Sequence, residues 1–361
     1  MTHPESEIGE KYGPQRLTVE LTDICNLHCS YCLRDEDALY GNPAHYLPLE
    51  FLIRVIRDAR DGIALTHVNY TGGEATLHPK FSQILSAVAA ERVKQSFVTN
   101  GWNFEKIWPA VIESRESISL IAFSLDGATA SEHDRWRGEG SFVRLVKAFA
   151  RCERARIPFA IKVGLRRDTV EQLEKVALFA ARVGASRLSF SHVLPTSSEF
   201  DKQAALNADE RAEAEREIAT LARIFKMDVG IDVGYYNLDP KPPCSPLAGK
   251  SCNIDYRGRL TLCCNLSGFR GAAAEEDVVA DLHVESFTSA HTRLRRLADI
   301  QMSRRAALIE QQQNLNTAAV DIFVGSPCLL CLQSFGKIPW KTDVAKNVTN
   351  IRALPVLIAN R

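Results

Sequence analysis

The chain has 361 residues, of which 45% are hydrophobic and 24% are charged, and its 44 Lys and Arg balance its 44 Asp and Glu. A chain of this length buries a sizeable core in one large domain or in two ordinary domains. No stretch approaches the roughly 18 apolar residues that a membrane span needs, and no overall positive charge would attract a phosphate backbone. We therefore expect a globular protein that binds neither membranes nor nucleic acids.

Short apolar runs alternate with amphipathic stretches from residue 16 to about residue 233, as in repeated βα units. The expected strands are residues 17–21, 67–70, 95–98, 120–124, 159–163 and 188–191. The expected helices are residues 49–60, 80–91, 104–113, 142–156, 169–183 and 209–225. Pro109 makes the helix over 104–113 the least certain of these. Six such units predict a parallel sheet, and periodicity alone does not decide between an open doubly wound sheet and a partial barrel.

The character of the sequence changes after residue 233. Residues 237–246 contain four prolines and are interpreted as a linker. Beyond the linker, residues 253–255 and 259–262 flank an Arg257-Gly258 turn and predict a β-hairpin, and a charged helix follows from about residue 289 to 313. The chain therefore divides into an N-terminal extension (1–15), a core domain (16–236) and a C-terminal domain (237–361).

Ten cysteines are many for a chain whose polar N-terminus carries neither a secretory signal nor a transit peptide. We expect a cytoplasmic protein, in which thiols stay reduced and disulfides are disfavoured. Three cysteines lie within eight residues near the start, six lie between Cys244 and Cys331, and Cys152 stands alone on an expected helix. This distribution predicts two metal or redox sites, one toward each end of the chain.

The first cysteine group, Cys25-Asn-Leu-His-Cys29-Ser-Tyr-Cys32, directly follows the first expected strand. In βα architectures the loops after the strands form the active-site edge. Three thiolates at this spacing can ligate three irons of a 4Fe–4S cluster and leave the fourth iron open for chemistry. The alternative is a zinc knuckle with His28 as fourth ligand, although adjacent positions in so short a loop make a tetrahedral site awkward.

This triad, with an aromatic residue before its last cysteine, resembles the signature of the radical S-adenosylmethionine (radical SAM) superfamily. Further segments resemble the family in the expected order. They are Tyr70-Thr-Gly-Gly-Glu74, Thr99-Asn-Gly101, Ser124-Leu-Asp-Gly127 and His133-Asp-Arg-Trp-Arg-Gly138. The resemblance spans nearly the whole chain and implies a partial (β/α)6 barrel of the TIM type, with a 4Fe–4S cluster on Cys25, Cys29 and Cys32 and with bound SAM.

The resemblance also implies roles for single residues. The backbone of Tyr31 would contact the adenine of SAM, and the turn at Gly73 would receive the methionine amino group, because glycine permits a close approach. Ser124 would contact polar groups of SAM, Arg137 its carboxylate or ribose, and Leu194 would pack on the adenine. The residues implied to bind the cofactor are Tyr31, Gly72, Gly73, Glu74, Ser124, Arg137 and Leu194.

The C-terminal cysteines resemble the SPASM and Twitch auxiliary-cluster domains of the same superfamily. Thirteen residues separate Cys244 from Gly258, four separate Gly258 from Cys263, and Cys328-Leu-Leu-Cys331 resembles the later cysteine pair of these domains. No cysteine follows Cys331, which favours the shorter Twitch form, a β-hairpin plus helix with one auxiliary 4Fe–4S cluster. The implied ligands are Cys244, Cys263, Cys328 and Cys331.

Six cysteines are more than one such cluster uses. The resemblance makes Cys252 the main rival of Cys244 as a metal ligand, because some members of the family ligate the cluster from a second cysteine inside the interval between Cys244 and Cys263. Cys264 is expected to be a buried neighbour, since adjacent side chains point in different directions along a strand. A structural zinc site is the alternative for the whole set.

These resemblances imply a radical SAM oxidoreductase or maturase that cleaves SAM to a 5′-deoxyadenosyl radical and abstracts a substrate hydrogen, with the auxiliary cluster assisting oxidation or substrate binding. The substrate is a small molecule of sugar or nucleotide type or a ribosomal peptide, and the short segment before the first strand favours a small molecule or a peptide presented by another protein. The expected electron donor is of flavodoxin or ferredoxin type. The alternatives are a peptide-modifying maturase of a ribosomal natural-product pathway and a non-enzymatic zinc-binding protein.

Overall fold

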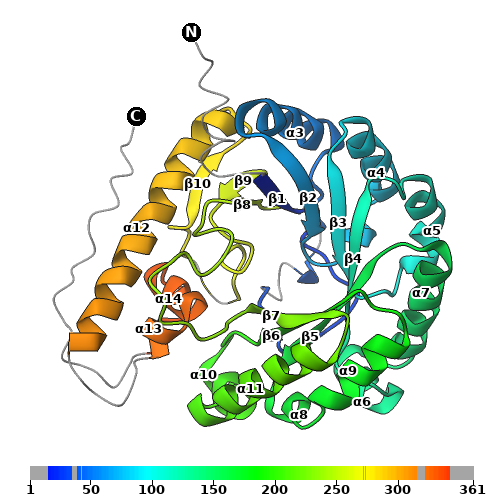
Figure 1. Ribbon diagram of the computed structural model, residues 1–361. Helices are drawn as coiled ribbons and strands as arrows, with labels where there is room; N and C mark the ends of the chain where they lie inside the picture. The colour runs from blue at the N-terminus through cyan, green and yellow to red at the C-terminus, as the bar shows by residue number, and fades with distance from the viewer. Residues whose placement is uncertain are drawn as a thin grey trace.

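The computed structural model describes residues 15–34, 39–41, 43–270, 272, 274–314 and 322–341. In this part of the chain the strands form one sheet in the order β10-β9-β8-β1-β2-β3-β4-β5-β6-β7. Strands β1 to β7 are parallel and curve around a centre, with helices on the outside (Figure 1). They are β1 (Gln15–Glu20), β2 (Leu65–Thr71), β3 (Lys94–Thr99), β4 (Ile118–Ser124), β5 (Phe159–Leu165), β6 (Arg187–His192) and β7 (Asp228–Val233).

The six expected strands are all present, and the parallel α/β fold is confirmed. Strand β7, which pairs with β6, is an addition that the sequence analysis did not assign. Its sequence alternates charged or glycine residues with apolar ones, so only one face of it looks like a buried strand. Asp232 of β7 bonds Ser191 of β6 at 2.5 Å and pairs with Lys162 of β5, which places polar groups on the sheet face opposite the apolar core.

The helices of the barrel are α3 (Leu49–Ile63), α4 (Phe81–Ala90), α5 (Phe104–Glu113), α6 (Ala130–Arg137), α7 (Ser141–Ala155), α8 (Arg167–Val170), α9 (Leu173–Arg182), α10 (Ser198–Ala204) and α11 (Ala208–Ile224). Pro109 lies inside α5 without ending it. The helix expected over 169–183 is divided into α8 and α9. The unexpected α6 begins with a capping box, in which Thr129 and Glu132 each bond the other's backbone N–H, so a local signal for this helix was present.

The apolar core lies between the outer face of the sheet and the helices. Phe123 of β4 meets Phe104 of α5 and Phe149 of α7 at ring-centroid distances of 5.0 and 5.2 Å. Phe149 also stacks on Phe159 of β5 at 5.3 Å. Burying each ring stabilises the fold by about 1.5–3 kcal/mol. These contacts fix α5 and α7 against the strands whose C-terminal ends carry the sequence motifs.

The C-terminal segment continues the barrel sheet. It contributes β8 (Ser251–Ile254), β9 (Arg259–Thr261) and β10 (Val278–Asp281). Strand β8 pairs with β1 in parallel, and β9 returns antiparallel to β8, which confirms the predicted hairpin. Gly258 in its turn has φ +78°, a conformation that favours glycine.

Three helices complete the described chain: α12 (Phe287–Asn314), α13 (Ile322–Gly325) and α14 (Pro327–Ser334). Helix α12 packs along α3, where the Phe287 N–H and the Thr288 hydroxyl both donate to Asp58 at 2.7 Å. Helix α14 carries Cys328 and Cys331. The division of the chain at residue 236 stays a prediction. Among the helices described, none is both long and apolar enough to cross a membrane.

Candidate metal and cofactor site

The three N-terminal cysteines lie on the loop after β1, at the C-terminal end of the parallel strands. All three are partly buried and free of disulfides. The Cys32 N–H donates to the Cys29 carbonyl at 2.9 Å and the Cys25 N–H to the Leu39 carbonyl at 3.0 Å, so the loop is folded. Burial, then the charge of Glu74 and those of the other two thiols, raise the pKa of Cys25 to about 12. Thiols grouped in this way ionise together most readily when a metal neutralises them.

The glycine pair after β2 lies against the cysteine loop. The Gly73 N–H donates to the Thr22 carbonyl at 2.9 Å, and the Glu74 N–H donates to the Ile24 carbonyl at 2.8 Å. A Cβ atom on Gly72 would lie 2.3 Å from the Thr22 carbonyl oxygen, and one on Gly73 would lie 2.0 Å from that of Ile24. Both positions therefore require glycine for contact between the two loops, a reason that the sequence analysis did not foresee.

Glu74 is buried, and its carboxylate is fully used by the protein. Its oxygens accept hydrogen bonds from the Thr76 N–H and hydroxyl, the Thr99 hydroxyl and the Asn100 N–H, at 2.6–3.2 Å. Burial raises the pKa of Glu74, and these donors oppose that rise. The side chain thus ties the end of β2 to the end of β3, and direct cofactor binding by Glu74 stays a prediction.

Asn100 connects this edge to the cysteine loop. Its Nδ2 donates to Asn26 Oδ1 at 3.0 Å and lies 3.9 Å from Cys25 Sγ, within the range of a hydrogen bond to sulfur. Its Oδ1 accepts from the Trp102 N–H at 2.9 Å. The Thr-Asn-Gly segment was noted as a motif, but its sequence gave no sign that the asparagine would reach a thiol 75 residues earlier in the chain.

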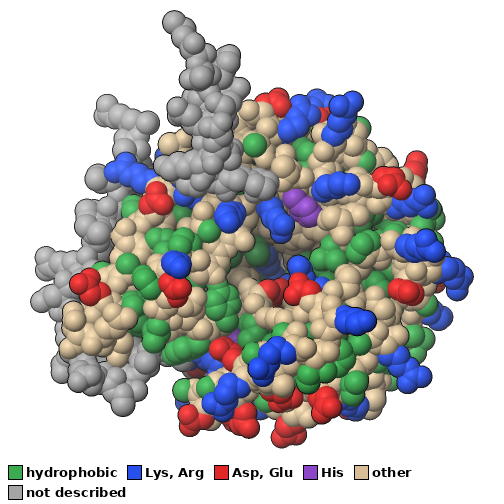
Figure 2. All heavy atoms as spheres, in the orientation of Figure 1, with side chains coloured by type: hydrophobic (Ala, Val, Ile, Leu, Met, Phe, Trp, Pro, Cys, Tyr) green, Lys and Arg blue, Asp and Glu red, His purple; other side chains and the backbone are tan. Residues whose placement is uncertain are grey.

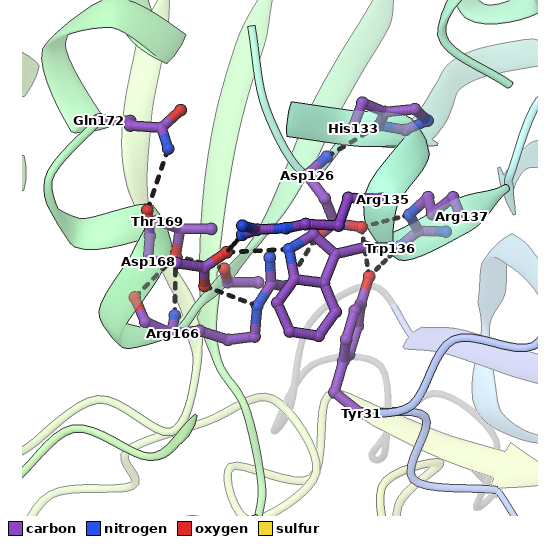
Figure 3. Close-up of polar contacts among 11 residues, drawn as sticks. Tyr31, Asp126, His133, Arg135, Trp136, Arg137, Arg166, Asp168, Thr169 and Gln172 are labelled. Atoms are coloured by element: carbon purple, nitrogen blue, oxygen red, sulfur yellow. Dashed lines mark hydrogen bonds and ion pairs between the residues drawn. The ribbon is translucent and has the colours of Figure 1, made fainter. Parts of the chain in front are cut away.

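Figure 3 shows a buried ionic network around Asp126. The charges of its members Arg137, Asp126 and Arg166 act on the Cys29 thiol. Asp126 accepts from Arg137, from the Tyr31 hydroxyl, and from Arg166 at 2.8 Å, and Arg137 also donates to the Tyr31 hydroxyl at 2.5 Å. Burial alone would raise the pKa of Asp126, but the two guanidinium groups hold it well below its usual range. The structure therefore brings together Tyr31 and Arg137, two predicted cofactor residues, and adds Asp126 and Arg166.

Arg166 was missed by the sequence analysis. Its side chain is 1% exposed, its Nε donates to Asp168 at 3.0 Å, and its guanidinium lies over the Trp136 ring at 4.1 Å and the Tyr31 ring at 4.7 Å (Figure 3). Its Nη2 is buried and has no hydrogen-bond partner among the described residues. A buried, unpaired guanidinium donor is suited to an anionic ligand.

The first two residues of the His-Asp-Arg-Trp-Arg-Gly motif accept hydrogen bonds from backbone N–H groups. His133 Nδ1 accepts from the Asp126 N–H at 3.0 Å, and burial lowers the pKa of His133 to about 4, so the ring is neutral near pH 7. Asp134 accepts from the Gly140 and Phe142 N–H groups at 2.8 Å, at the start of α7. These contacts hold the loop after β4 and helix α6 in place for the ionic network.

Ser124 and Leu194 lie on the same edge of the barrel. Ser124 is partly buried at the end of β4. Leu194 follows β6, is 5% exposed, and lines a cavity of about 230 Å³ that α10, α11 and α14 also border. Contact of either residue with SAM stays a prediction.

The C-terminal thiols form a second group. Burial raises the pKa of Cys328 to about 12 and also raises that of Cys331 well above its ordinary value, and the charge of Cys244 raises both. A hydrogen bond with Cys264, then burial, raise the pKa of Cys263, and Cys244 adds to this rise as well. The charge of Cys244 thus acts on the three other predicted ligands, and their sharing of one metal centre stays a prediction.

The two remaining cysteines differ in position. Cys252 lies in β8 beside Asn253, whose amide donates to Glu20 at 3.0 Å. Because adjacent strand residues face opposite ways, Cys252 points to the apolar core, and burial alone raises its pKa to about 12. Cys264, expected to be only a neighbour, contributes to the raised pKa of Cys244 and so lies within electrostatic range of the group.

A buried guanidinium accompanies the second group. Arg305 of α12 is 1% exposed, donates to the backbone carbonyls of Asp239 and Asn237, and opposes the rise in the pKa of Cys244 and Cys331. Its positive charge favours the thiolate forms. No three His, Cys, Asp or Glu side chains in the described ranges are arranged around a single ion. By number and chemistry, the two groups fit 4Fe–4S clusters with three and four thiolates.

A cavity of about 440 Å³ separates the Gly72–Gly73 turn from the C-terminal hairpin. Ion pairs line it on both sides: Arg34 with Glu20 at 2.9 Å, and Lys337 with Asp277 at 2.8 Å. Barrel residues and C-terminal residues therefore line one cavity, which contains an ion pair from each.

A parallel barrel with three thiols after its first strand and a glycine pair after its second has the features of a radical SAM domain. The family model described as Radical SAM superfamily matches residues 19–180. Over these residues the chain matches that superfamily, which confirms the resemblance drawn from the motifs.

Curated relatives match over the same region. Mycofactocin maturase MftC of Mycobacterium tuberculosis (strain ATCC 25618 / H37Rv) is 33% identical over 197 residues, which are 52% of this chain and 48% of that protein. PqqA peptide cyclase of Ruegeria pomeroyi (strain ATCC 700808 / DSM 15171 / DSS-3) is 27% identical over 184 residues, 50% of this chain and 48% of that protein. The chain thus spans about half the length of the curated relatives it matches.

Solved structures extend the likeness to the fold. Streptococcus suis SuiB bound to S-adenosylmethionine aligns with a TM-score of 0.63 and 15% identity, covering 81% of this chain and 71% of that one. The protein anSMEcpe with bound AdoMet aligns with a TM-score of 0.60 and 16% identity, covering 79% and 83%. At these identities the likeness concerns the fold, and it confirms the partial barrel.

Proposed function

We propose that this chain is a radical SAM enzyme that cleaves S-adenosylmethionine reductively and modifies a ribosomally made peptide. The observation that carries the proposal is the group of three partly buried thiols after β1, held against the Gly72–Gly73 turn and flanked by Asn100 and Arg137. Relatives named as a maturase and as a peptide cyclase support a peptide substrate, and SuiB is also described as bound to precursor peptide SuiA.

In this proposal Cys25, Cys29 and Cys32 hold a 4Fe–4S cluster. When bound, that cluster supplies the electron that splits SAM into methionine and the 5′-deoxyadenosyl radical, which abstracts a substrate hydrogen. The chain's own residues bind SAM and the cluster and adjust the charge around them. Asn100 stabilises negative charge on the Cys25 sulfur, and the unpaired Nη2 of Arg166 offers a donor to an anionic group of SAM.

The second group of thiols holds an auxiliary 4Fe–4S cluster in this proposal. Its ligands are Cys244, Cys263, Cys328 and Cys331, and the charge of Cys244 contributes to the raised pKa of each of the other three. The orientation of Cys252 toward the apolar core argues against this rival. An auxiliary cluster here would accept an electron during substrate oxidation or help to bind the substrate.

The cavity between the Gly72–Gly73 turn and the C-terminal hairpin is the proposed place of the substrate. Its volume of about 440 Å³ and its ion pairs suit a polar peptide segment more than an apolar ligand. The relatives named above favour a peptide over the sugar- or nucleotide-type molecule that the sequence left open.

The test is anaerobic purification and reconstitution with iron and sulfide, followed by dithionite and SAM. We expect about eight irons per chain and formation of 5′-deoxyadenosine. The triple variant Cys25→Ala/Cys29→Ala/Cys32→Ala should retain about four irons and form no 5′-deoxyadenosine. The matched control, Cys152→Ala, removes a buried cysteine outside both groups and should behave as wild type. A colourless protein with stoichiometric zinc and no SAM cleavage would overturn the proposal in favour of a zinc-binding protein.

A further inference from the structure

A smaller cavity lies where the end of β6 meets the helix that carries Cys328 and Cys331. Its volume is about 230 Å³, and residues of α10, α11 and α14 border it together with the segment after β6. Leu194, Leu206 and Leu329 give it a buried apolar wall. Apart from the predicted contact of Leu194 with SAM, the proposed chemistry gives this cavity no role.

The charged side chains that line the cavity carry an excess of positive charge. They are Arg167, Lys202, Arg211, Lys341 and Asp201. Asp201 accepts from Lys341. Arg167 pairs at 3.1 Å with Glu210, which lies outside the lining. No ion pair with a described carboxylate compensates Arg211 or the exposed Lys202.

The surface around the cavity does not share this excess. Helix α11 carries five acidic and three basic residues. Figure 2 shows side chains of both charges on the outer surface where α10 and α11 lie in Figure 1. The positive excess is therefore a feature of the cavity.

Arg211 is the buried cation of this set. The residue is 8% exposed, and its Nε has no hydrogen-bond partner among the residues that the structure describes. The guanidinium lies over the Tyr236 ring, 5.0 Å from its centroid, a contact that orients the group but uses none of its N–H donors. Buried polar groups are nearly always hydrogen-bonded, so an unpaired guanidinium donor beside a cavity indicates a ligand that accepts from it.

The two carboxylates nearest to Arg211 are engaged elsewhere. The charges of Glu215 and Asp201 act on Arg211, but neither group forms an ion pair with it. Glu215 accepts from the Tyr236 N–H at 3.2 Å and bonds His192 at 3.1 Å. Because both carboxylates already have partners, the anion that Arg211 lacks has to come from outside these residues.

We propose that Arg211 and this cavity bind a carboxylate attached to an apolar group, as at the C-terminus of a peptide that ends in an apolar residue or at a glutamate side chain. The inference rests on the proposed function and names a recognition element of its peptide substrate. Two N–H groups of one guanidinium can donate together to the two oxygens of a carboxylate. A bare inorganic anion would leave the leucine wall unused, whereas an apolar group beside the carboxylate would be buried against it.

The position and size of the cavity agree with this ligand. Its volume is below that of a typical small-molecule site, which suits one residue of a peptide. A peptide held there would lie against α14, between two predicted ligands of the auxiliary cluster and the edge of the barrel where the strands end. The cavity would thus anchor the substrate beside the proposed reaction centre.

The test is equilibrium dialysis of the reconstituted protein against radiolabelled N-acetyl-leucine. Wild type should bind this probe saturably, and the neutral N-acetyl-leucinamide should bind about tenfold more weakly. Arg211→Gln should weaken the binding of N-acetyl-leucine about tenfold, and Arg211→Lys should weaken it less, because lysine keeps the charge. N-acetylglutamic acid α-amide carries its carboxylate on the side chain, so the tighter-binding acid identifies the source of the carboxylate, and either result supports the site.

The matched control is Arg223→Gln, at an exposed position near the end of the same helix α11. This control should bind N-acetyl-leucine as wild type does. Ala205→Phe fills the cavity, keeps Arg211, and should also prevent binding, so the test does not depend on the folding of one variant. Circular dichroism and thermal unfolding identify the variants that fold.

The contrary results are distinct. No saturable binding to wild type, equal binding of the acid and the amide, or unchanged binding in the folded Arg211→Gln and Ala205→Phe proteins would overturn the site. Displacement of the probe by SAM would assign the cavity to SAM and would overturn it as well. Because binding is measured without a reductant, a protein that binds the probe but never cleaves SAM would refute the proposed function and leave the carboxylate site intact.

Discussion

Replacing Asp126 by asparagine removes the negative charge that two buried guanidinium groups share. Asp126 contacts Arg137 and Arg166, and the side chains of all three are at most 12% exposed. Asparagine keeps the size of the side chain and one acceptor oxygen, so the main loss is the charge. Removing one partner from a buried ion pair costs about 3–5 kcal/mol, and we expect the variant to be less stable by that amount at pH 7.

The loss depends on pH in a direction that the structure fixes. The guanidinium groups overcome the effect of burial and hold the pKa of Asp126 below its value in an unfolded chain, about 3.9. A group of this kind stabilises the fold above the unfolded pKa, and that stability is lost as pH falls through the folded pKa. The difference between wild type and Asp126→Asn should therefore be constant from about pH 5 to 8 and shrink below about pH 4.

Anaerobic urea unfolding of the reconstituted proteins, followed by circular dichroism at several pH values, measures this difference. Asp228→Asn is the matched control, because Asp228 bonds Arg187 at 2.6 Å but is 62% exposed. An exposed pair contributes less than about 1 kcal/mol. If both variants lose the same stability at pH 7, or if the loss at Asp126 persists unchanged at pH 3, the reasoning on the shared charge is refuted.

Three further predictions concern the thiol groups. Gly73→Ala should lower iron retention at the first cluster and stability together, because its methyl group meets a backbone carbonyl at 2.0 Å; iron analysis and thermal unfolding measure both. Asn100→Ala should lower the midpoint potential of the first cluster, because it removes a hydrogen bond to Cys25; an EPR-monitored redox titration measures this. Cys328→Ala should lose about half of the iron but keep SAM cleavage, whereas Cys252→Ala should keep all of the iron.

Each of these predictions has a contrary result. Unaltered iron content and melting in Gly73→Ala would show that the two loops can separate without cost. A potential in Asn100→Ala that equals wild type would remove Asn100 from the surroundings of the cluster. Loss of the auxiliary iron in Cys252→Ala would make Cys252 a ligand, and full iron in Cys328→Ala would remove Cys328 from the proposed ligands.

Much of the fold was predictable because its signals are local. The six apolar runs lie in the chain where β1 to β6 lie in the structure, since strands covered by helices must be apolar on the buried face. Strand β7 was not predicted, because Asp232 and the glycine of that strand face a polar interior. Its sequence pattern therefore resembles that of a loop. The hairpin at Gly258 was predictable, but its pairing with β1, more than 230 residues earlier in the chain, was not.

Some features of the candidate site were likewise predictable from the sequence, and others were not. The spacing of Cys25, Cys29 and Cys32 by itself indicated a metal-binding loop, because three thiolates so close together have few other uses. The sequence did not show that Arg166 would meet Asp126 or that Asn100 would reach Cys25, since these contacts depend on which strands are neighbours and on how their ends twist.

The sequence by itself therefore determined the repeating units, the thiol spacings and the glycine pair, all of which act within a few residues. Only the tertiary structure decided which backbone atoms lie so close to Gly72 and Gly73 that a side chain there would clash, and which charges are buried together. The physical reason is that burial and electrostatic interaction depend on distance in space, and folding brings together residues that the chain keeps far apart.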